Sequence, residues 1–143
     1  MMRYPVVIEE GGETKAFGVV FPDLPGCFSA GDTLDEALTN ATEAAAAWID
    51  ATLDAGAAVP PPSALDVVRK LSDYSGWAVG FVTIDPAVLD DQVERANISL
   101  PRRVLERLDA LAEAAHESRS GMIAAMTLQT SLVPSERRKR QPR

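Results

Sequence analysis

The sequence is poor in the residues that build metal sites, disulfides and membrane anchors. It contains one cysteine, Cys27, and one histidine, His116, in 143 residues. A lone cysteine excludes an intrachain disulfide framework, and one residue of each type leaves too few ligands for a zinc site. No charged leader runs into an apolar stretch, and no long apolar run occurs. We therefore expect a cytoplasmic protein with no metal, no cofactor and no membrane contact.

Positive charge is scarce in the first part of the chain and abundant in the last part. Residues 1–92 hold 4 Lys and Arg against 15 Asp and Glu, whereas residues 93–143 hold 10 against 6. The basic end suits phosphate, and the acidic front suits a basic protein or is simply a solvated surface. The overall net charge of −7 hides this division.

Hydrophobic residues make up 46% of the chain, which permits a sizeable core, and the length allows one domain plus a small module. We predict a first domain over residues 1–86, a linker over 87–92, a second module over 93–130 and a disordered basic tail over 131–143. The tail is a charge run without apolar periodicity. It either adds salt-sensitive affinity for DNA or has no role.

The first domain alternates short β-type runs with one long helical pattern. The helix has the spacing of a capping box at Thr33 and Glu36, and its apolar residues recur every three or four positions until Gly56. Ser63 is expected to cap a short helix after three prolines. In order, we predict strands at 4–10, 16–21 and 27–30, helices at 33–56 and 63–71, and a strand at 77–85, which is a β-β-β-α-(α)-β order.

The second module begins with an alternating segment, residues 94–100, in which Arg95, Asn97 and Ser99 share one face. Pro101 then opens an amphipathic helix that stops around residues 116–118, and Ser118 or Ser120 can cap a second apolar helix. One strand and two helices cannot bury their apolar faces alone. Pairing of the strand with its copy from a second chain would close the core and give a two-stranded ribbon that fits the major groove.

Two stretches of sequence resemble the HicB family of type II antitoxins. Residues 97–101, Asn-Ile-Ser-Leu-Pro, with the helix 103–112, are similar to the family's C-terminal domain of the ribbon-helix-helix branch. Residues 4–8 and 21–38, the latter containing Phe-Pro-Asp-Leu-Pro-Gly followed by Gly-Asp-Thr-Leu-Asp-Glu-Ala, look like its N-terminal domain. The resemblance spans nearly all of residues 3–128.

The resemblance implies an α+β protein with a partial RNase H-like N-terminal domain and a ribbon-helix-helix dimerisation module. It implies that the first domain binds a HicA-like, RNA-cleaving toxin and covers its active site. It further implies that paired C-terminal modules bind operator DNA and repress the operon. Assembly beyond the homodimer is left open.

Candidate DNA-contacting residues follow from this ribbon. Arg95 can pair with guanine, Asn97 with adenine, and Ser99 with a base or a phosphate. Ser118, Arg119 and Ser120 lie at a helix start, where amide hydrogens favour phosphate, although Ser118 can also be only a cap. Arg102 can reach the DNA backbone or lie in solvent.

Toxin contacts are harder to predict, and the loop with Asp23, Leu24, Cys27 and Phe28 is our candidate. A metal-dependent nuclease is an alternative hypothesis, because RNase H-like folds can hold divalent metal ions on carboxylates. The carboxylates concerned are Asp23, Asp32, Asp35 and Glu36, but a turn and a helix cap explain them, and the sequence predicts no catalysis. The alternative to an antitoxin is a ribbon-helix-helix regulator whose first domain senses a small ligand or another protein.

Overall fold

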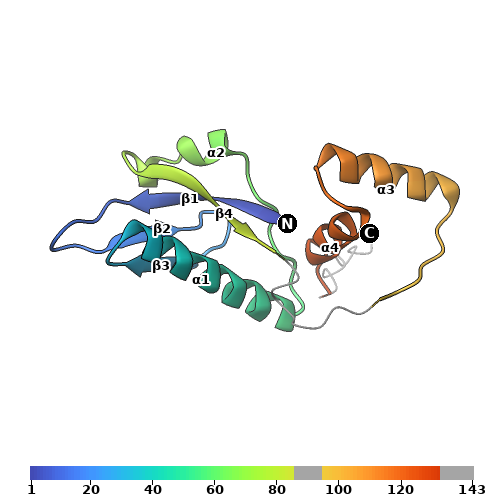
Figure 1. Ribbon diagram of the computed structural model, residues 1–143, viewed down its shortest axis with the longest axis horizontal. Coiled ribbons are helices and arrows are strands. Elements are labelled where there is room, and N and C mark those ends of the chain that lie inside the picture. Colours follow the sequence, from blue (N-terminus) through green and yellow to red (C-terminus); the bar gives the residue numbers. More distant parts are fainter. Residues whose placement is uncertain (86–94, 133–143) are drawn as a thin grey trace, which may run out of the picture.

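The computed structural model describes residues 1–85 and 95–132 (Figure 1). The predicted linker at 87–92 and nearly all of the predicted tail lie outside these described residues. The described chain is α+β, with a four-stranded antiparallel sheet in the order β3-β2-β1-β4. One long helix packs on one face of the sheet. The last two helices of the described chain lie beside one end of the sheet (Figure 1).

All four predicted strands of the first domain are present. Strand β1 (Met2–Glu9) pairs on one side with β2 (Phe17–Val20) and on the other with β4 (Ala78–Ile84). Strand β3 (Phe28–Gly31) pairs with β2 and forms one edge of the sheet. Strand β4 forms the opposite edge.

The core lies between the sheet and helix α1 (Leu34–Asp54). Alternate residues of β1 point to this helix, because successive side chains of a strand face opposite ways. The helix contributes mostly alanines, which let it lie close to the sheet. A Cβ on Gly31 would come within 2.5 Å of the Ala37 nitrogen, so this contact requires glycine. The residues that the two elements bury in this core are Met2, Tyr4, Val6, Ala37, Ala41, Ala45 and Ile49.

The sequence placed both ends of α1 correctly. The Thr33 side chain accepts a hydrogen bond from the Glu36 backbone nitrogen at 3.1 Å. The Glu36 carboxylate in turn accepts one from the Asp32 nitrogen at 3.2 Å. At the other end Gly56 adopts a φ of 71°, which glycine tolerates best, and its amide bonds the Leu53 carbonyl.

The predicted cap at Ser63 is wrong. Helix α2 (Leu65–Arg69) begins two residues later and has Ala64 at its N-cap without a side-chain bond. The Ser63 nitrogen and hydroxyl both donate to the Asp23 carboxylate instead, at 2.9 and 2.5 Å. This tertiary contact ties the polyproline segment to the loop after β2, and a short 3-10 helix, η1 (Ser72–Tyr74), then leads to β4.

The second module has the two predicted helices, α3 (Arg102–Ala114) and α4 (Arg119–Leu128). Pro101 stands at the N-cap of α3, one position before the helix. His116 takes a φ of 54° after α3, and the Glu117 nitrogen bonds the Ala112 carbonyl, which closes the helix end. Residues 95–100 form no strand in this single chain.

Helix α4 is joined to the first domain at its C-terminal end. The Val59 nitrogen donates to the Leu128 carbonyl at 2.7 Å, and the Leu132 nitrogen donates to the Gly56 carbonyl at 2.7 Å. Leu128 also packs against the core of the first domain. The two parts therefore share a small hydrogen-bonded contact at the end of α1, visible where α4 approaches that end in Figure 1.

Candidate functional site

The segment before α3 lies over a hollow of about 350 Å³ between the segment and the two helices. Its lining mixes apolar side chains with polar groups from the start of α4. The lining residues are Ala96, Asn97, Ile98, Leu100, Leu105, Arg119, Ser120 and Ile123.

Several large apolar side chains of the module are exposed, and Ile98 among them lines this hollow. Ile98 is 65% exposed, Val104 is 49% exposed and Met126 is 45% exposed. Only Leu108 and Ala112 are buried among the described residues of the module. Within its described residues the module therefore has only a small buried core of its own.

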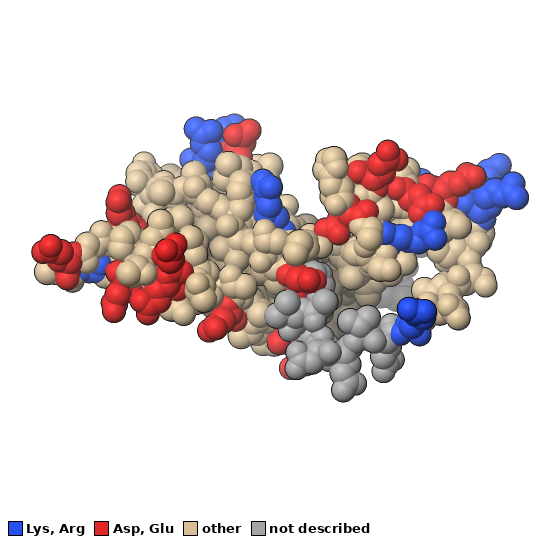
Figure 2. Space-filling view, viewed as in Figure 1, with Lys and Arg blue, Asp and Glu red and all other residues tan. Residues whose placement is uncertain are grey.

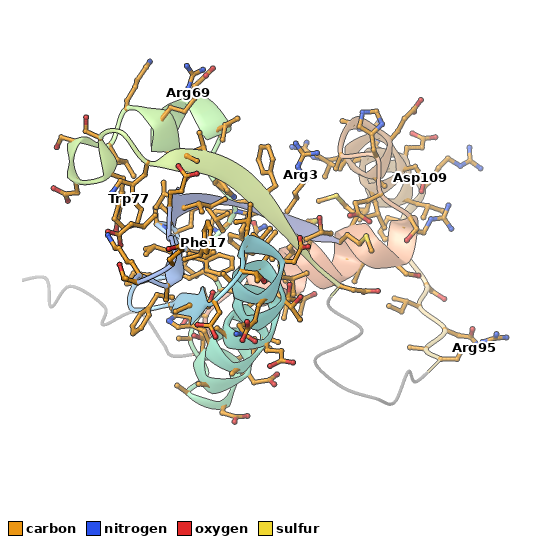
Figure 3. All side chains as sticks on the ribbon, turned by 60° about the vertical axis from the view of Figure 1, so that its left-hand side comes forward. Arg3, Phe17, Arg69, Trp77, Arg95 and Asp109 are labelled. Carbon is orange, nitrogen blue, oxygen red and sulfur yellow. The ribbon has the colours of Figure 1, made fainter. Side chains whose placement is uncertain are left out.

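The three predicted base-reading residues lie on this exposed segment. Arg95, Asn97 and Ser99 are all exposed. Figure 3 shows the Arg95 side chain pointing away from the helices. Asn97 also lines the hollow, so alternation along the segment is not strict in the single chain. The geometry leaves Arg95 and Ser99 open to a ligand.

The residues predicted to contact phosphate have different surroundings. Ser118 is the N-cap of α4 and accepts a hydrogen bond from the Gly121 nitrogen at 3.0 Å. Ser120 and Arg119 line the hollow. Arg102 is exposed at the start of α3 and makes no ion pair within the described chain.

The Arg119 side chain is bound to another side chain of the same module. Its guanidinium donates two hydrogen bonds to the Asp109 carboxylate, which links α4 to α3. This bidentate pair lowers the pKa of Asp109 and raises that of Arg119. Both side chains remain about half exposed, so the pair can be opened by a competing anion.

The predicted toxin-contact loop divides into buried and exposed residues. Leu24 is fully buried and Cys27 is 4% exposed, so neither offers much surface. Burial raises the pKa of the Cys27 thiol to about 11. Asp23 is held by Ser63, whereas Phe28 is 69% exposed on β3. Of the four residues, Phe28 presents a large apolar surface.

The carboxylates considered for metal binding do not converge. No group of three or more His, Cys, Asp or Glu side chains in the described residues is arranged to hold a metal ion. Asp23 bonds Ser63, while Asp32 and Glu36 take part in the α1 cap. Their placement is explained by the fold.

Charge is distributed unevenly over the surface. Figure 2 shows acidic side chains at the β1–β2 hairpin tip and along α1, whereas the second module carries basic side chains at its far end and acidic side chains beside them. Among the described residues no helix is both long and apolar enough to cross a membrane. The first domain is thus acidic along α1 and the hairpin, whereas the described residues of the second module carry charges of both signs.

Comparison with known proteins identifies the family. The family described as the HicB-like antitoxin of bacterial toxin-antitoxin systems matches residues 4–127. The chain belongs to this HicB-like antitoxin family. The family resemblance inferred from residues 4–8, 21–38 and 97–112 is therefore confirmed.

Relatives of this HicB-family chain include a protein of Haemophilus phage HP1 described as an uncharacterized 14.9 kDa protein, 36% identical over 108 residues. That match covers 76% of this chain and 80% of the phage protein. The crystal structure of the Burkholderia pseudomallei antitoxin HicB is similar at a TM-score of 0.71 and 33% identity, covering 90% of this chain and 98% of that one. The crystal structure of antitoxin HicB3 is similar at a TM-score of 0.62 and 30% identity, with coverage of 89% and 96%.

Proposed function

We propose that this HicB-family chain is the antitoxin of a type II system, which blocks a HicA-like RNA-cleaving toxin and represses its own operon as a ribbon-helix-helix dimer. The observation that carries the second half is the segment 95–100, which forms no strand in the single chain and lies over a hollow lined by both apolar and polar side chains. The antitoxin role itself follows from the family.

The dimer follows from the incomplete core of the second module. A second copy of segment 95–100 would pair with the first and turn Ile98 and Leu100 inward. Pairing would cover surface that is 65% exposed at Ile98 and 38% exposed at Leu100. Burial of apolar surface at about 25 cal/mol per Å² would stabilise the pair. The opposite faces of the two segments would then form one ribbon.

The ribbon would read bases and the helix starts would hold phosphates. Arg95, Asn97 and Ser99 would enter the major groove, where arginine pairs best with guanine and asparagine with adenine. Ser118 and Ser120 at the start of α4, with Arg102, would bind the DNA backbone and set its register. Arg119 would join them on release from Asp109.

The first domain would bind the toxin. A related chain, 37% identical over its matched part with a TM-score of 0.50, was solved as a HicA3 and HicB3 toxin-antitoxin complex. The acidic surface along α1 and the hairpin would attract a basic toxin, with exposed Phe28 as an apolar anchor. We propose that residues 1–86 form a partial RNase H-like domain, which binds the toxin and has no catalytic role. The complex would act in the cytoplasm.

The test is co-expression with the product of the neighbouring short reading frame, followed by affinity capture and a growth assay. We expect a stable complex and restored growth. Capture without toxicity, or toxicity without rescue, would contradict the antitoxin role. Repression is tested separately by binding of the purified chain to its own promoter DNA, with the variant Ile98→Asp as the dimer-deficient control.

A further inference from the structure

The outer face of α1 carries a row of carboxylates. Residues about seven or eighteen positions apart lie on nearly the same side of a helix, because one turn takes about 3.6 residues. Exposed acids of α1 have this spacing, on the side opposite the alanines that are buried against the sheet. Figure 2 shows acidic side chains along this helix. We call the row the acidic stripe, and its members are Glu36, Glu43, Asp50 and Asp54.

No positive charge balances the stripe within the described residues. Helix α1 contains no Lys or Arg, and none of the stripe carboxylates takes part in an ion pair of the described chain. Asp50 and Asp54 lie near the C-terminal end of α1, where the negative end of the helix dipole disfavours carboxylates. A cationic group at this end would therefore relieve both the repulsion between the acids and their repulsion from the dipole.

The described chain ends beside this end of α1. The Leu132 nitrogen and the Ser131 hydroxyl both donate to the Gly56 carbonyl, at 2.7 and 3.3 Å. Gly56 lies just after α1 and closes its C-terminal end. The chain that follows Leu132 therefore starts at the acidic end of the helix.

The sequence after Leu132 is basic and long enough to follow the stripe. Residues 133–143 lie outside the described residues and contain 5 Lys and Arg against 1 Glu. In extended form this segment reaches about 36 Å, whereas the 21 residues of α1 span about 32 Å. The basic run 137–140 begins about 17 Å past Leu132, so it can reach the level of Asp50 and Glu43.

Attachment to the same chain favours this contact over other partners of the stripe. A single exposed ion pair contributes little, but several act together here, and a short tether keeps the tail at a local concentration of about a millimolar. The other acidic surface of the domain, the β1–β2 hairpin tip, lies at the opposite end from the C-terminus of α1 (Figure 1). The stripe is thus the acidic surface at which the tail begins.

We propose that residues 133–143 lie along the acidic stripe of their own chain. Their basic side chains then pair with the stripe carboxylates and compensate the C-terminal end of α1. The stripe competes with DNA phosphates for these side chains, and a basic toxin has to displace the tail from α1. This consequence, unlike the contact itself, rests on the proposed function.

Two cysteines in the full-length chain test the contact. Thr39 is exposed on the stripe side of α1. It lies about 26 Å along the helix from Gly56, and Gln141 can extend about 30 Å past Leu132, so only a tail that follows α1 brings the two positions together. Thr39→Cys with Gln141→Cys should therefore form an internal disulfide on mild oxidation. Cys27 is 4% exposed and will not interfere.

The matched control keeps both cysteines and removes charge from the stripe. Glu43→Gln, Asp50→Asn and Asp54→Asn leave the tether unchanged, so a loss of linking reports the charge alone. We expect about ten-fold slower linking in this control at low salt, as the combined effect of several exposed ion pairs. At about 1 M salt the two proteins should link at the same slow rate, because charges are then screened within about 3 Å. Non-reducing electrophoresis of dilute protein separates linked monomer from linked dimer.

A charge exchange tests whether the tail and the stripe recognise each other. Reversing three tail arginines should slow linking to the rate of the control, and reversing three stripe acids in the same protein should restore it. Lysines near the C-terminal end of α1 suit the helix dipole, so the fold should tolerate them. The tail changes are Arg137→Glu, Arg138→Glu and Arg140→Glu, and the stripe changes are Glu43→Lys, Asp50→Lys and Asp54→Lys.

Equal linking rates of the cysteine pair and its control at low salt would overturn the contact, as would a charge exchange that restores nothing. Linked dimer in place of linked monomer would overturn its placement within one chain. Promoter binding is measured separately on the chain without added cysteines. Charge-dependent linking that persists in a chain without promoter binding supports the contact and contradicts only the proposed repressor role.

The effect on DNA has its own control. The three neutral stripe changes should tighten promoter binding several-fold at low salt, because the freed tail adds phosphate contacts. Adding Arg137→Gln, Arg138→Gln and Arg140→Gln should cancel this gain if it comes from release of the tail. A gain of equal size with and without the tail arginines would reflect the lost negative charge alone, and would overturn competition between the stripe and DNA.

Discussion

Arg119 and Asp109 join the two helices of the second module through a bidentate ion pair, with donor–acceptor distances of 2.8 and 2.9 Å. Arginine binds phosphate through the same fork of donors. Asp109 therefore competes directly with DNA for Arg119. The structure shows the arginine in its engaged state, so its contribution to DNA binding depends on how easily this pair opens.

Removal of the Asp109 charge should strengthen DNA binding. Asp109→Asn keeps the side-chain shape but frees Arg119, so affinity for the promoter should rise several-fold at low salt. One added phosphate contact should steepen the slope of log affinity against log salt by about 0.9. Fluorescence anisotropy at several salt concentrations measures both. An unchanged slope would show that Arg119 does not contact phosphate.

Loss of either base reader should weaken operator recognition without affecting toxin neutralisation. Arg95→Ala and Asn97→Ala should each cost about 1–3 kcal/mol of discrimination between operator and unrelated DNA. The comparison is a gel-shift titration against the two DNAs, together with the growth-rescue assay. Wild-type operator affinity in both variants would contradict the ribbon assignment.

The exposed ring of Phe28 should be an anchor for the toxin. Phe28→Ala should weaken the toxin complex by about 1–3 kcal/mol, which is typical of a central aromatic contact. Its thermal midpoint should stay near that of the wild type because the ring is 69% exposed. Calorimetric titration measures the affinity, and Val67→Ala on α2, where the side chain is 56% exposed, is the matched control. Equal affinities for the two variants would place the toxin elsewhere.

Asp23 should stabilise the folded protein. Its carboxylate accepts both bonds from Ser63, so Asp23→Ala leaves these donors without their partner and should lower the free energy of unfolding by about 1–3 kcal/mol. Urea unfolding measures this loss. A double-mutant cycle with Ser63→Ala should give a clear coupling energy. Additive effects would show that the two side chains do not support each other.

Tyr4 should make the fold sensitive to alkali. Burial, with a smaller effect of the Asp23 charge, raises the pKa of Tyr4 from 10.0 to about 12. Because the folded state holds this proton more tightly, its contribution to stability is complete below pH 10 and is lost as the pH rises toward 12. Tyr4→Phe should remove that part of the decline.

Tyr4→Phe should also lower the stability of the folded protein at neutral pH. The Tyr4 hydroxyl donates to the Pro60 carbonyl at 2.6 Å, and loss of this bond should destabilise the fold by about 1 kcal/mol. Unfolding curves of both proteins between pH 7 and 12 give the comparison. Parallel pH dependences would show that Tyr4 does not titrate with a raised pKa.

The sequence by itself determined the elements whose signals are local. Short apolar runs predicted the four strands of the first domain, whereas the alternation at 94–100 predicted a strand that residues 95–100 do not form in the single chain. The Thr33 and Glu36 spacing and Gly56 predicted both ends of α1, because capping bonds connect residues only a few positions apart. The motifs at residues 21–38 and 97–101 gave the family. Charge counts alone separated the acidic front from the basic end.

Only the tertiary structure decided which side chains are engaged. Ser63 had the local signature of a cap but bonds Asp23, 40 positions away in the sequence. Arg119, which the sequence predicts to contact phosphate, is bonded to Asp109 in the single chain. The position of β4 at an edge of the sheet likewise depends on the strand order β3-β2-β1-β4. Contacts between distant segments are chosen by how the whole chain packs, and residue type and spacing do not encode that choice.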